Sequence, residues 1–221
     1  SSIDNNLYSV LDDITFINSN ILNDKNFESI FGTQSSNGIL LIANSLLLGF
    51  ILFYASRYFL SHLTYTQTEP PFRFIFKLIL FGIAMNFSFF IIEMFLDLNS
   101  NISLAIRNLG QSLFGKNISF SELINVINTN MSVDTSSINI FSIDGLIKGT
   151  LSISLLNLVF SYSLRYIMVK VFVLLTPFAF LALTMNSTNW FFKAWAKNIF
   201  SLLFIQIIVS LVLLILFSMD F

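Results

Sequence analysis

Three long apolar stretches, each nearly free of charged residues, constrain the fold of this chain more than any other feature. They cover residues 38–60, 74–96 and 198–219. A helix rises about 1.5 Å per residue and the hydrocarbon layer of a bilayer is about 30 Å thick, so about twenty apolar residues suffice to cross it. We therefore predict one transmembrane helix in each stretch.

The composition excludes a water-soluble domain and most enzyme chemistries. Of the 221 residues, 55% are hydrophobic and only 10% are charged, whereas soluble domains carry about 25% charged residues. Too few polar residues remain to cover a surface in water. The chain has no cysteine and a single histidine, His62, which argues against disulfides, histidine-rich metal sites and a Ser-His-Asp triad. We expect an all-α polytopic membrane helix bundle that is not an enzyme and binds no cofactor.

A fourth apolar region, residues 146–192, is interrupted by Arg165 and Lys170. Two full spans in this region would require a turn between the two cations, where the sequence Arg-Tyr-Ile-Met-Val-Lys contains no Gly, Pro, Asn or Asp. One long helix would leave both cations near the middle of the membrane, at a cost of about 3 kcal/mol each. We therefore favour a third arrangement.

This third arrangement combines one span with a re-entrant segment. The span covers residues 146–168, and the Arg165 and Lys170 side chains snorkel to the cytoplasmic headgroups. Residues 171–189 re-enter the bilayer as a hairpin broken at Pro177, which has no amide hydrogen; irregular backbone at that depth requires surrounding protein or a water-filled cavity. Four following residues are predicted to anchor the last span at the interface: Trp190, Lys193, Trp195 and Lys197.

The distribution of charge predicts the orientation and the organisation of the chain. Cytoplasmic loops carry the excess of Lys and Arg, and here the cations gather in the link 57–77 and in segment 165–197. The acidic N-terminus is therefore predicted outside, and its start, Ser-Ser-Ile-Asp, fits a cleaved signal peptide and an artificial start equally well. Four parts follow: an N-terminal segment (1–37), a first helix pair (38–96), an extracytoplasmic loop (97–145) and a C-terminal transmembrane region (146–221).

The segments predicted outside contain amphipathic helices. Their apolar residues recur at helical spacing in three sets: Leu7, Leu11, Ile14, Ile17 and Ile21; Ile102, Ile106, Leu109 and Leu113; Leu123, Ile124, Ile127 and Met131. The third set follows a capping-box pattern from Ser119 to Glu122. These helices have three possible places: on the membrane surface, on a partner, or on the bundle of the protein itself.

Polar residues inside the spans are expensive in lipid and should face other helices or water. They are Asn44, Asn86, Glu93, Asn157, Arg165 and Gln206. Gln206 is expected to bond between helices, which is worth about 1 kcal/mol. Glu93 either reaches the interface or lines a hydrated path with Asn86. For these residues we favour packing between helices over a pore.

The order of features in the C-terminal region resembles a known family. An arginine in a long helix (Arg165) precedes Thr-Pro-Phe-Ala at 176–179 and a polar turn at 186–189. The residues that follow are Phe192, Lys193, Trp195, Lys197 and Gln206. This pattern, strongest over residues 155–217, resembles the TrbL/VirB-type polytopic inner-membrane subunits of bacterial type IV secretion (conjugation) systems. The chain is shorter than many members, and upstream the likeness is confined to the placement of spans.

The resemblance implies a channel or scaffold subunit in the bacterial inner membrane. Such a subunit would form a homo-oligomer, contact pilin or stalk, periplasmic and ATPase components, and help to translocate DNA or protein while supporting pilus or stalk assembly. Two alternatives come from other classes: a small stand-alone transporter or channel, in which a broken helix builds the substrate site, and a holin or immunity-type membrane protein.

Overall fold

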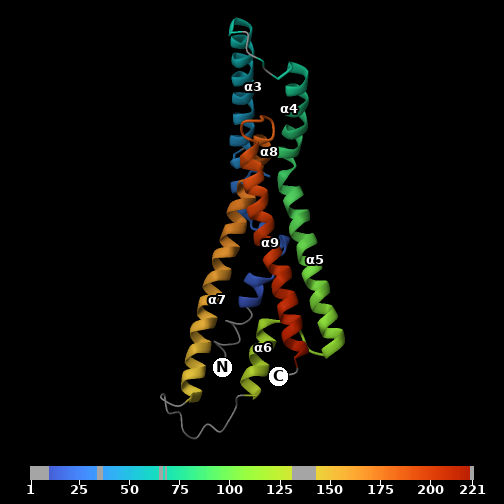
Figure 1. Cartoon of the computed structure of the whole chain (residues 1–221), viewed down its shortest axis with the longest axis vertical. Coiled ribbons are helices and arrows are strands. Elements are labelled where there is room, and N and C mark those ends of the chain that lie inside the picture. Colours follow the sequence, from blue (N-terminus) through green and yellow to red (C-terminus); the bar gives the residue numbers. More distant parts are fainter. Residues whose placement is uncertain (1–9, 34–36, 65–66, 68, 131–142, 220–221) are drawn as a thin grey trace. The chain divides into compact units, whose positions relative to one another are not determined.

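The structure is a computed structural model that describes residues 10–33, 37–64, 67, 69–130 and 143–219. All regular structure in this part of the chain is helical, which confirms the all-α prediction (Figure 1). Residues 10–15 form a short helical segment. The elements after it are η1 (Ser19–Leu22), α2 (Lys25–Phe31), α3 (Ile39–Thr64), α4 (Pro71–Asn86), α5 (Ser88–Phe114), α6 (Phe120–Asn130), α7 (Ile143–Leu174), α8 (Thr176–Ala182) and α9 (Asn189–Ser218).

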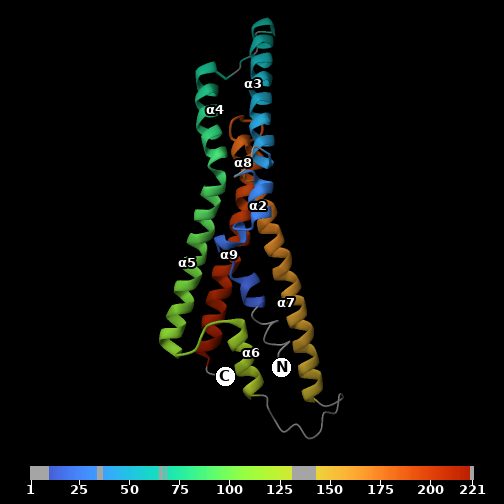
Figure 2. The ribbon, with the colours of Figure 1, turned by 180° about the vertical axis from the view of Figure 1, so that it is seen from behind.

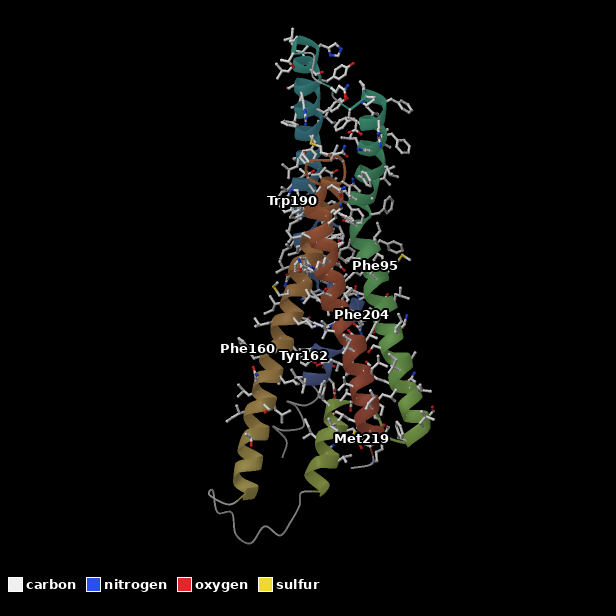
Figure 3. All side chains as sticks on the ribbon, in the orientation of Figure 1. Phe95, Phe160, Tyr162, Trp190, Phe204 and Met219 are labelled. Atoms are coloured by element: carbon white, nitrogen blue, oxygen red, sulfur yellow. The ribbon has the colours of Figure 1, made fainter. Side chains whose placement is uncertain are left out.

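In the described part of the chain, four helices are long and apolar enough to cross a membrane, so the protein is a multi-pass membrane protein. They are Ile39–Thr64, Ser88–Phe114, Ile153–Leu174 and Asn189–Ser218. At most 28% of the most apolar window of any of them is buried inside the protein. Among the exposed apolar side chains labelled in Figure 3 are Phe160, Trp190, Phe204 and Met219. An apolar exterior of this extent requires lipid or other protein around it.

The second predicted span differs from the helix found. The sequence predicted a span at 74–96, whereas the qualifying helix α5 continues to Phe114. At Phe87, between α4 and α5, the hydrogen bonding is nearly continuous, since its amide donates to the Ile83 carbonyl at 3.0 Å. No Gly or Pro interrupts the chain after Leu96 before Gly110, and α5 ends at Phe114, directly before Gly115, whose φ of 66° suits the glycine that follows a helix.

The chain divides into two compact units, one of residues 1–18, 97–169 and 202–221 (unit 1) and one of residues 19–96 and 170–201 (unit 2). In unit 2, α3, α4 and α8 lie side by side (Figure 1), and α2 lies against α3 (Figure 2). The buried centre of this group consists of Ala43, Met85 and Leu181. Unit 2 thus surrounds the short helix α8 with protein.

At the break predicted at Pro177, α7 and α8 are separated by the single residue Leu175, across which hydrogen bonding is nearly continuous: its amide donates to the Val171 carbonyl at 3.1 Å, and its carbonyl accepts from the Ala179 amide at 3.0 Å. Leu175 lies in a turn between the two helices, and Pro177 occupies the first turn of α8, where a missing amide hydrogen costs nothing. Both Thr176 and Pro177 are buried. A polar turn at 183–188 then leads into α9. The segment α7–α8–α9 is therefore a helical hairpin with an interrupted first arm, and its re-entry into a bilayer stays a prediction.

In unit 1, the N-terminal segment packs inside the protein. Leu11 and Ile17 are fully buried, and Asp12 accepts hydrogen bonds from the amide and hydroxyl of Ser121 and from the Phe120 amide, the last at 2.8 Å. Asp12 therefore caps α6, where a carboxylate also suits the helix dipole. The predicted capping contact within α6 forms too, because the Glu122 amide donates to Ser119 Oγ at 3.1 Å. Leu7 and Met131 lie outside the described residues.

The predicted apolar stripe of residues 102–113 is helical, but it faces outward. Ile102, Leu109 and Leu113 are exposed, while the buried face of α5 carries Asn99, Ser103 and Gly110. Packing of this stripe on the bundle of the protein itself is therefore wrong. A small, polar buried face with an apolar outer face is the pattern of helices packed within a membrane, where lipid solvates the apolar side chains.

The helices α5 and α9 bury residues at intervals of three or four, apart from one interval of seven between Ser103 and Gly110 in α5. The buried positions are Ile92, Leu96, Asn99, Ser103 and Gly110 in α5, and Ile199, Leu203, Gln206, Ser210 and Leu213 in α9. Alternating steps of three and four residues define the seam of a coiled coil. Both helices thus present a narrow buried seam. In each, two consecutive seam positions are polar: Asn99 and Ser103 in α5, and Gln206 and Ser210 in α9.

Candidate functional site: a buried polar cluster around Arg165

The most unusual side chain of unit 1 is Arg165, which lies within the third candidate span. It is only 5% exposed. Its Nε donates to the Leu202 carbonyl at 2.7 Å, and one terminal nitrogen donates to the Thr15 carbonyl at 2.8 Å. The other terminal nitrogen is buried and has no hydrogen-bond partner. The prediction that Arg165 snorkels to the headgroups is therefore wrong, because backbone carbonyls of the N-terminal segment and α9 bind it inside the protein.

The charge of Arg165 is not neutralised by any acid in the described part of the chain, since no salt bridge to it forms there. A buried guanidinium costs several kcal/mol in lost hydration, about as much as a good partner returns. Neutral carbonyl groups recover only part of this cost. An ionisable group at this position in a span is a functional candidate, since chains without a use for it avoid the cost.

A buried polar pair joins α5 to α9 in unit 1. Ser103 Oγ and Ser210 Oγ are 2.6 Å apart and buried. Farther along both helices, a Cβ at Gly110 would lie 2.7 Å from Leu214 Cδ1. A later residue of α5 thus contacts a later residue of α9, so the two helices run parallel in unit 1. Asn99 and Gln206, four residues before the two serines, therefore lie at one level of the seam.

Gln206 lies on α9 next to the carbonyl that binds Arg165. It lies one helical turn after Leu202, whose carbonyl accepts from Arg165. Side chains in a helix lean toward its N-terminus, so the Gln206 amide is directed toward the level of the guanidinium. Gln206 is 0% exposed, and neither its nitrogen nor its oxygen has a partner. The expected bond from Gln206 to another helix is therefore absent.

Unsatisfied polar atoms concentrate in this region of unit 1. Those of unit 1 are Thr15 Oγ1, Asn99 Nδ2, the second terminal nitrogen of Arg165, and both Nε2 and Oε1 of Gln206. Native proteins rarely leave such atoms unpaired, and those that do mark a bound water, an ion or a functional group. The set is rich in donors around one positive charge. It is suited to hold water or an anionic group inside the membrane domain.

The predicted interfacial anchor divides into a buried and an exposed part. Trp195 is 6% exposed, and its indole Nε1 donates to the Phe172 carbonyl at 2.8 Å, so its prediction as an interfacial residue is wrong. Trp190 is 67% exposed (Figure 3), and Lys193 and Lys197 are exposed as well. These three residues alone are accessible to headgroups.

Lys170 and Pro177 lie inside unit 2 with different partners. The Lys170 Nζ is 5.4 Å from the ring centre of Phe27, as in a cation–π contact. Pro177 is buried in α8. Lys170 therefore contributes to packing as well as to charge. The helix α7 continues through Arg165 and Lys170, without the turn that two full spans would require.

Asn86 bonds to another helix, as its packing interpretation predicts. Asn44 Nδ2 donates to Asn86 Oδ1 at 3.1 Å, and Asn86 Nδ2 donates to Asn44 Oδ1 at 3.2 Å. Glu93 is half-buried and makes no hydrogen bond or ion pair with any described residue. Asn157 is exposed. Asn86 and Glu93 thus differ in surroundings, and only Asn86 is tied to a neighbouring helix.

The reciprocal amide pair of Asn44 and Asn86 is expected to couple α3 to α4. We expect a double-mutant cycle with Asn44→Ala and Asn86→Ala to give a coupling free energy of about 0.6–1.7 kcal/mol, the range of interhelical hydrogen bonds in membrane proteins. The measurement is the free energy of unfolding in mixed micelles. Additive single changes would show that the two amides stabilise the helices independently.

Sequence reasoning missed Thr15, Asn99, Ser103 and Ser210 as members of the buried cluster. For Asn99, Ser103 and Ser210, the sequence contained a usable signal: Asn99 and Ser103 on α5 have the same four-residue spacing as Gln206 and Ser210 on α9. Thr15 gave no such signal, because only its backbone carbonyl contacts Arg165.

Comparison with known proteins gave no match: no protein-family model, no curated protein and no solved structure matches this chain.

Proposed function

We propose that the protein is a channel or scaffold subunit of the TrbL/VirB type in the inner membrane of a bacterium, acting within a type IV secretion system. The observation that carries this proposal is the helical hairpin α7–α8–α9. The residues that resemble the family lie in this hairpin, where Pro177 lies in the first turn of α8 and the Trp195 indole donates to the Phe172 carbonyl. The hairpin is thus a fixed element, as a subunit at the base of a large assembly requires.

Contacts within each unit support the proposed orientation. In unit 2, the Lys77 ammonium donates to Asn186 Oδ1 at 3.0 Å, so the link 57–77 and the turn after α8 lie together, and both are assigned to the cytoplasmic side. In unit 1, Asp12 contacts the start of α6, and both segments are assigned to the outside. The proposed cytoplasmic surface presents Lys193 and Lys197 to an ATPase or to nucleic-acid phosphates.

The proposed subunit acts as a homo-oligomer whose exposed apolar helices contact lipid and neighbouring copies. Energy would come from the ATPases of the system, and pilin or stalk and periplasmic components would contact the outer segments. Translocated DNA or protein would pass through the assembly. The subunit itself contributes the membrane helices and the buried cation of Arg165.

Tagging the chain in its own bacterium tests this proposal. We expect secretion ATPases and pilus or stalk components to co-purify with the tagged chain from mildly solubilised membranes, and deletion of its gene to abolish transfer. Complementation by the unaltered chain should restore transfer. Normal transfer in the deletion strain, together with purification free of these components, would contradict the proposal.

A stand-alone channel or transporter is the second candidate, and the Arg165 cluster favours it specifically. Unsatisfied donors around a buried cation are also typical of anion-conducting or substrate-binding sites in single proteins. Purified chain in liposomes distinguishes the two functions. Ion or solute flux that the Arg165→Met variant lacks would favour the stand-alone function, and the secretion subunit alone is expected to show none.

A further inference from the structure

A cavity of about 330 Å³ lies in unit 2, where α3, α4 and the turn after α8 meet. Its apolar wall includes Tyr54 and Phe74, whose rings stack 3.8 Å apart. Its polar wall includes Arg57, Glu69 and Ser187. The volume falls at the lower end of the range of small-molecule sites, about 300–1,000 Å³. One aromatic and one polar wall suit a ligand that is itself amphipathic.

The acid of this cavity is already neutralised. Glu69 Oε1 lies 2.6 Å from the Lys77 ammonium and 3.5 Å from Arg73 Nε. The backbone carbonyl of Glu69 accepts from the Tyr54 hydroxyl at 2.6 Å, and Lys77 is also bound to Asn186. These contacts fix the polar wall in place. They also leave Glu69 without the capacity to neutralise a further cation.

Arg57 is the basic side chain of the cavity that is not paired with Glu69. It is exposed, lines the cavity, and makes no hydrogen bond or ion pair with a described residue. With Arg73 and Lys77 it gives three positive charges against the single negative charge of Glu69. The electrostatic balance therefore favours an anionic ligand, and a guanidinium binds two oxygens of a phosphate group at once.

The place of Arg57 along α3 identifies the source of such an anion. Residues 39–56 contain no charged side chain, and Arg57 follows Ile39 by 18 residues, a rise of about 27 Å along the helix. This rise is close to the thickness of the hydrocarbon layer, about 30 Å. Arg57 thus lies where the apolar part of α3 reaches the headgroup region. The same end of unit 2 carries exposed phenylalanines, Phe53 at 56%, Phe72 at 83% and Phe76 at 61%.

We propose that this cavity binds the phosphate of an anionic glycerophospholipid. Arg57 binds the phosphate, Ser187 donates to it from the same polar wall, and the acyl chains lie on the exposed phenylalanines of α3 and α4. The lipid would join α3, α4 and the turn after α8 at one point, and so stabilise the end of unit 2 that faces the headgroups.

The test uses the full chain, purified in mild detergent and studied by native mass spectrometry. Phosphatidylglycerol and phosphatidylcholine with identical acyl chains are added, and retained lipid is counted. We expect tighter binding of phosphatidylglycerol, weakened about tenfold in Arg57→Gln, as the loss of one charge-assisted hydrogen bond predicts. Ser187→Phe, which fills the cavity at unchanged charge, should weaken it as well. Lys116→Gln removes an exposed cation from the segment after α5 and should leave binding unchanged.

Glycerol 3-phosphate and inorganic phosphate at millimolar concentration form the soluble arm of the test. Failure of both to displace the lipid supports the proposal, whereas displacement by either would overturn it in favour of a soluble phosphate compound. Equal binding by the unaltered chain and Arg57→Gln, or equal retention of the two lipids, would overturn the site itself. The thermal unfolding midpoint of each variant, measured without lipid, confirms that the fold is intact.

Discussion

Replacing Arg165 by methionine is expected to stabilise the protein and to abolish its proposed activity. Methionine has a similar length and no charge, so it removes a guanidinium that is 5% exposed and incompletely bonded. Replacement of buried charged groups by apolar residues of similar volume is often neutral or stabilising, by about 1–4 kcal/mol. We therefore expect a higher free energy of unfolding in mixed micelles. A stabilised but inactive variant would identify Arg165 as a functional group.

Two matched variants separate the charge of Arg165 from its contacts. Arg165→Lys keeps the charge, but its donors lie on a single nitrogen and do not reproduce the two separate nitrogens that bond to Thr15 and Leu202, so we expect it to be less stable than the unaltered chain. Gln206→Leu removes two unsatisfied polar atoms and should stabilise the protein by about 1–3 kcal/mol. A large loss of stability in Arg165→Met would instead show that Arg165 holds the N-terminal segment and α9 together.

The sequence predicted the helices well, because their signal is local. About twenty consecutive apolar residues determine a span by themselves, and Pro177 determines a break by its own chemistry. The hydrogen bonds within each helix also satisfy its backbone without any distant partner. Spans, the break and the capping contact of Ser119 could therefore be predicted from short stretches.

The surroundings of Arg165 and Trp195 could not be predicted, because distant residues determine them. Arg165 is buried by a carbonyl 150 residues earlier in the chain and another 37 residues later. The rule that places long cations at the membrane interface assumes that no internal acceptor is available. Likewise, Trp195 has the composition of an interfacial residue, but a free carbonyl at the end of α7 provides it with a partner inside the protein.

The expectation that the apolar stripe of α5 packs on the bundle applied a rule for proteins in water to a helix in a membrane. In water, an apolar stripe faces the core, and one interpretation of residues 102–113 relied on that rule. In a bilayer, lipid solvates apolar side chains, and the small or polar residues form the contacts between helices. Asn99, Ser103 and Gly110 are buried accordingly.

Replacing Trp195 by alanine is expected to cause the largest loss of stability in unit 2. The Phe172 carbonyl lies in the last turn of α7, where no helical amide remains to bond the final carbonyls, and it accepts from Trp195 Nε1 and from Thr176 Oγ1 at 3.1 Å. The Trp195 ring also lies 6.0 Å from Phe180 and 5.6 Å from Phe192. Trp195→Ala removes the bond and the ring together, so we expect a loss of about 3–5 kcal/mol.

Conservative variants assign this loss to its two causes. Trp195→Phe keeps an aromatic ring and removes only the indole donor, so we expect a loss of about 1 kcal/mol in the free energy of unfolding. Trp190→Ala, at a side chain that is 67% exposed, should change stability by no more than about 0.5 kcal/mol. All three variants should still insert in the membrane, because the hydropathy of α9 is retained. If Trp195→Ala and Trp190→Ala had equal effects, Trp195 would lie at the interface and the hairpin would not depend on its bond to Phe172.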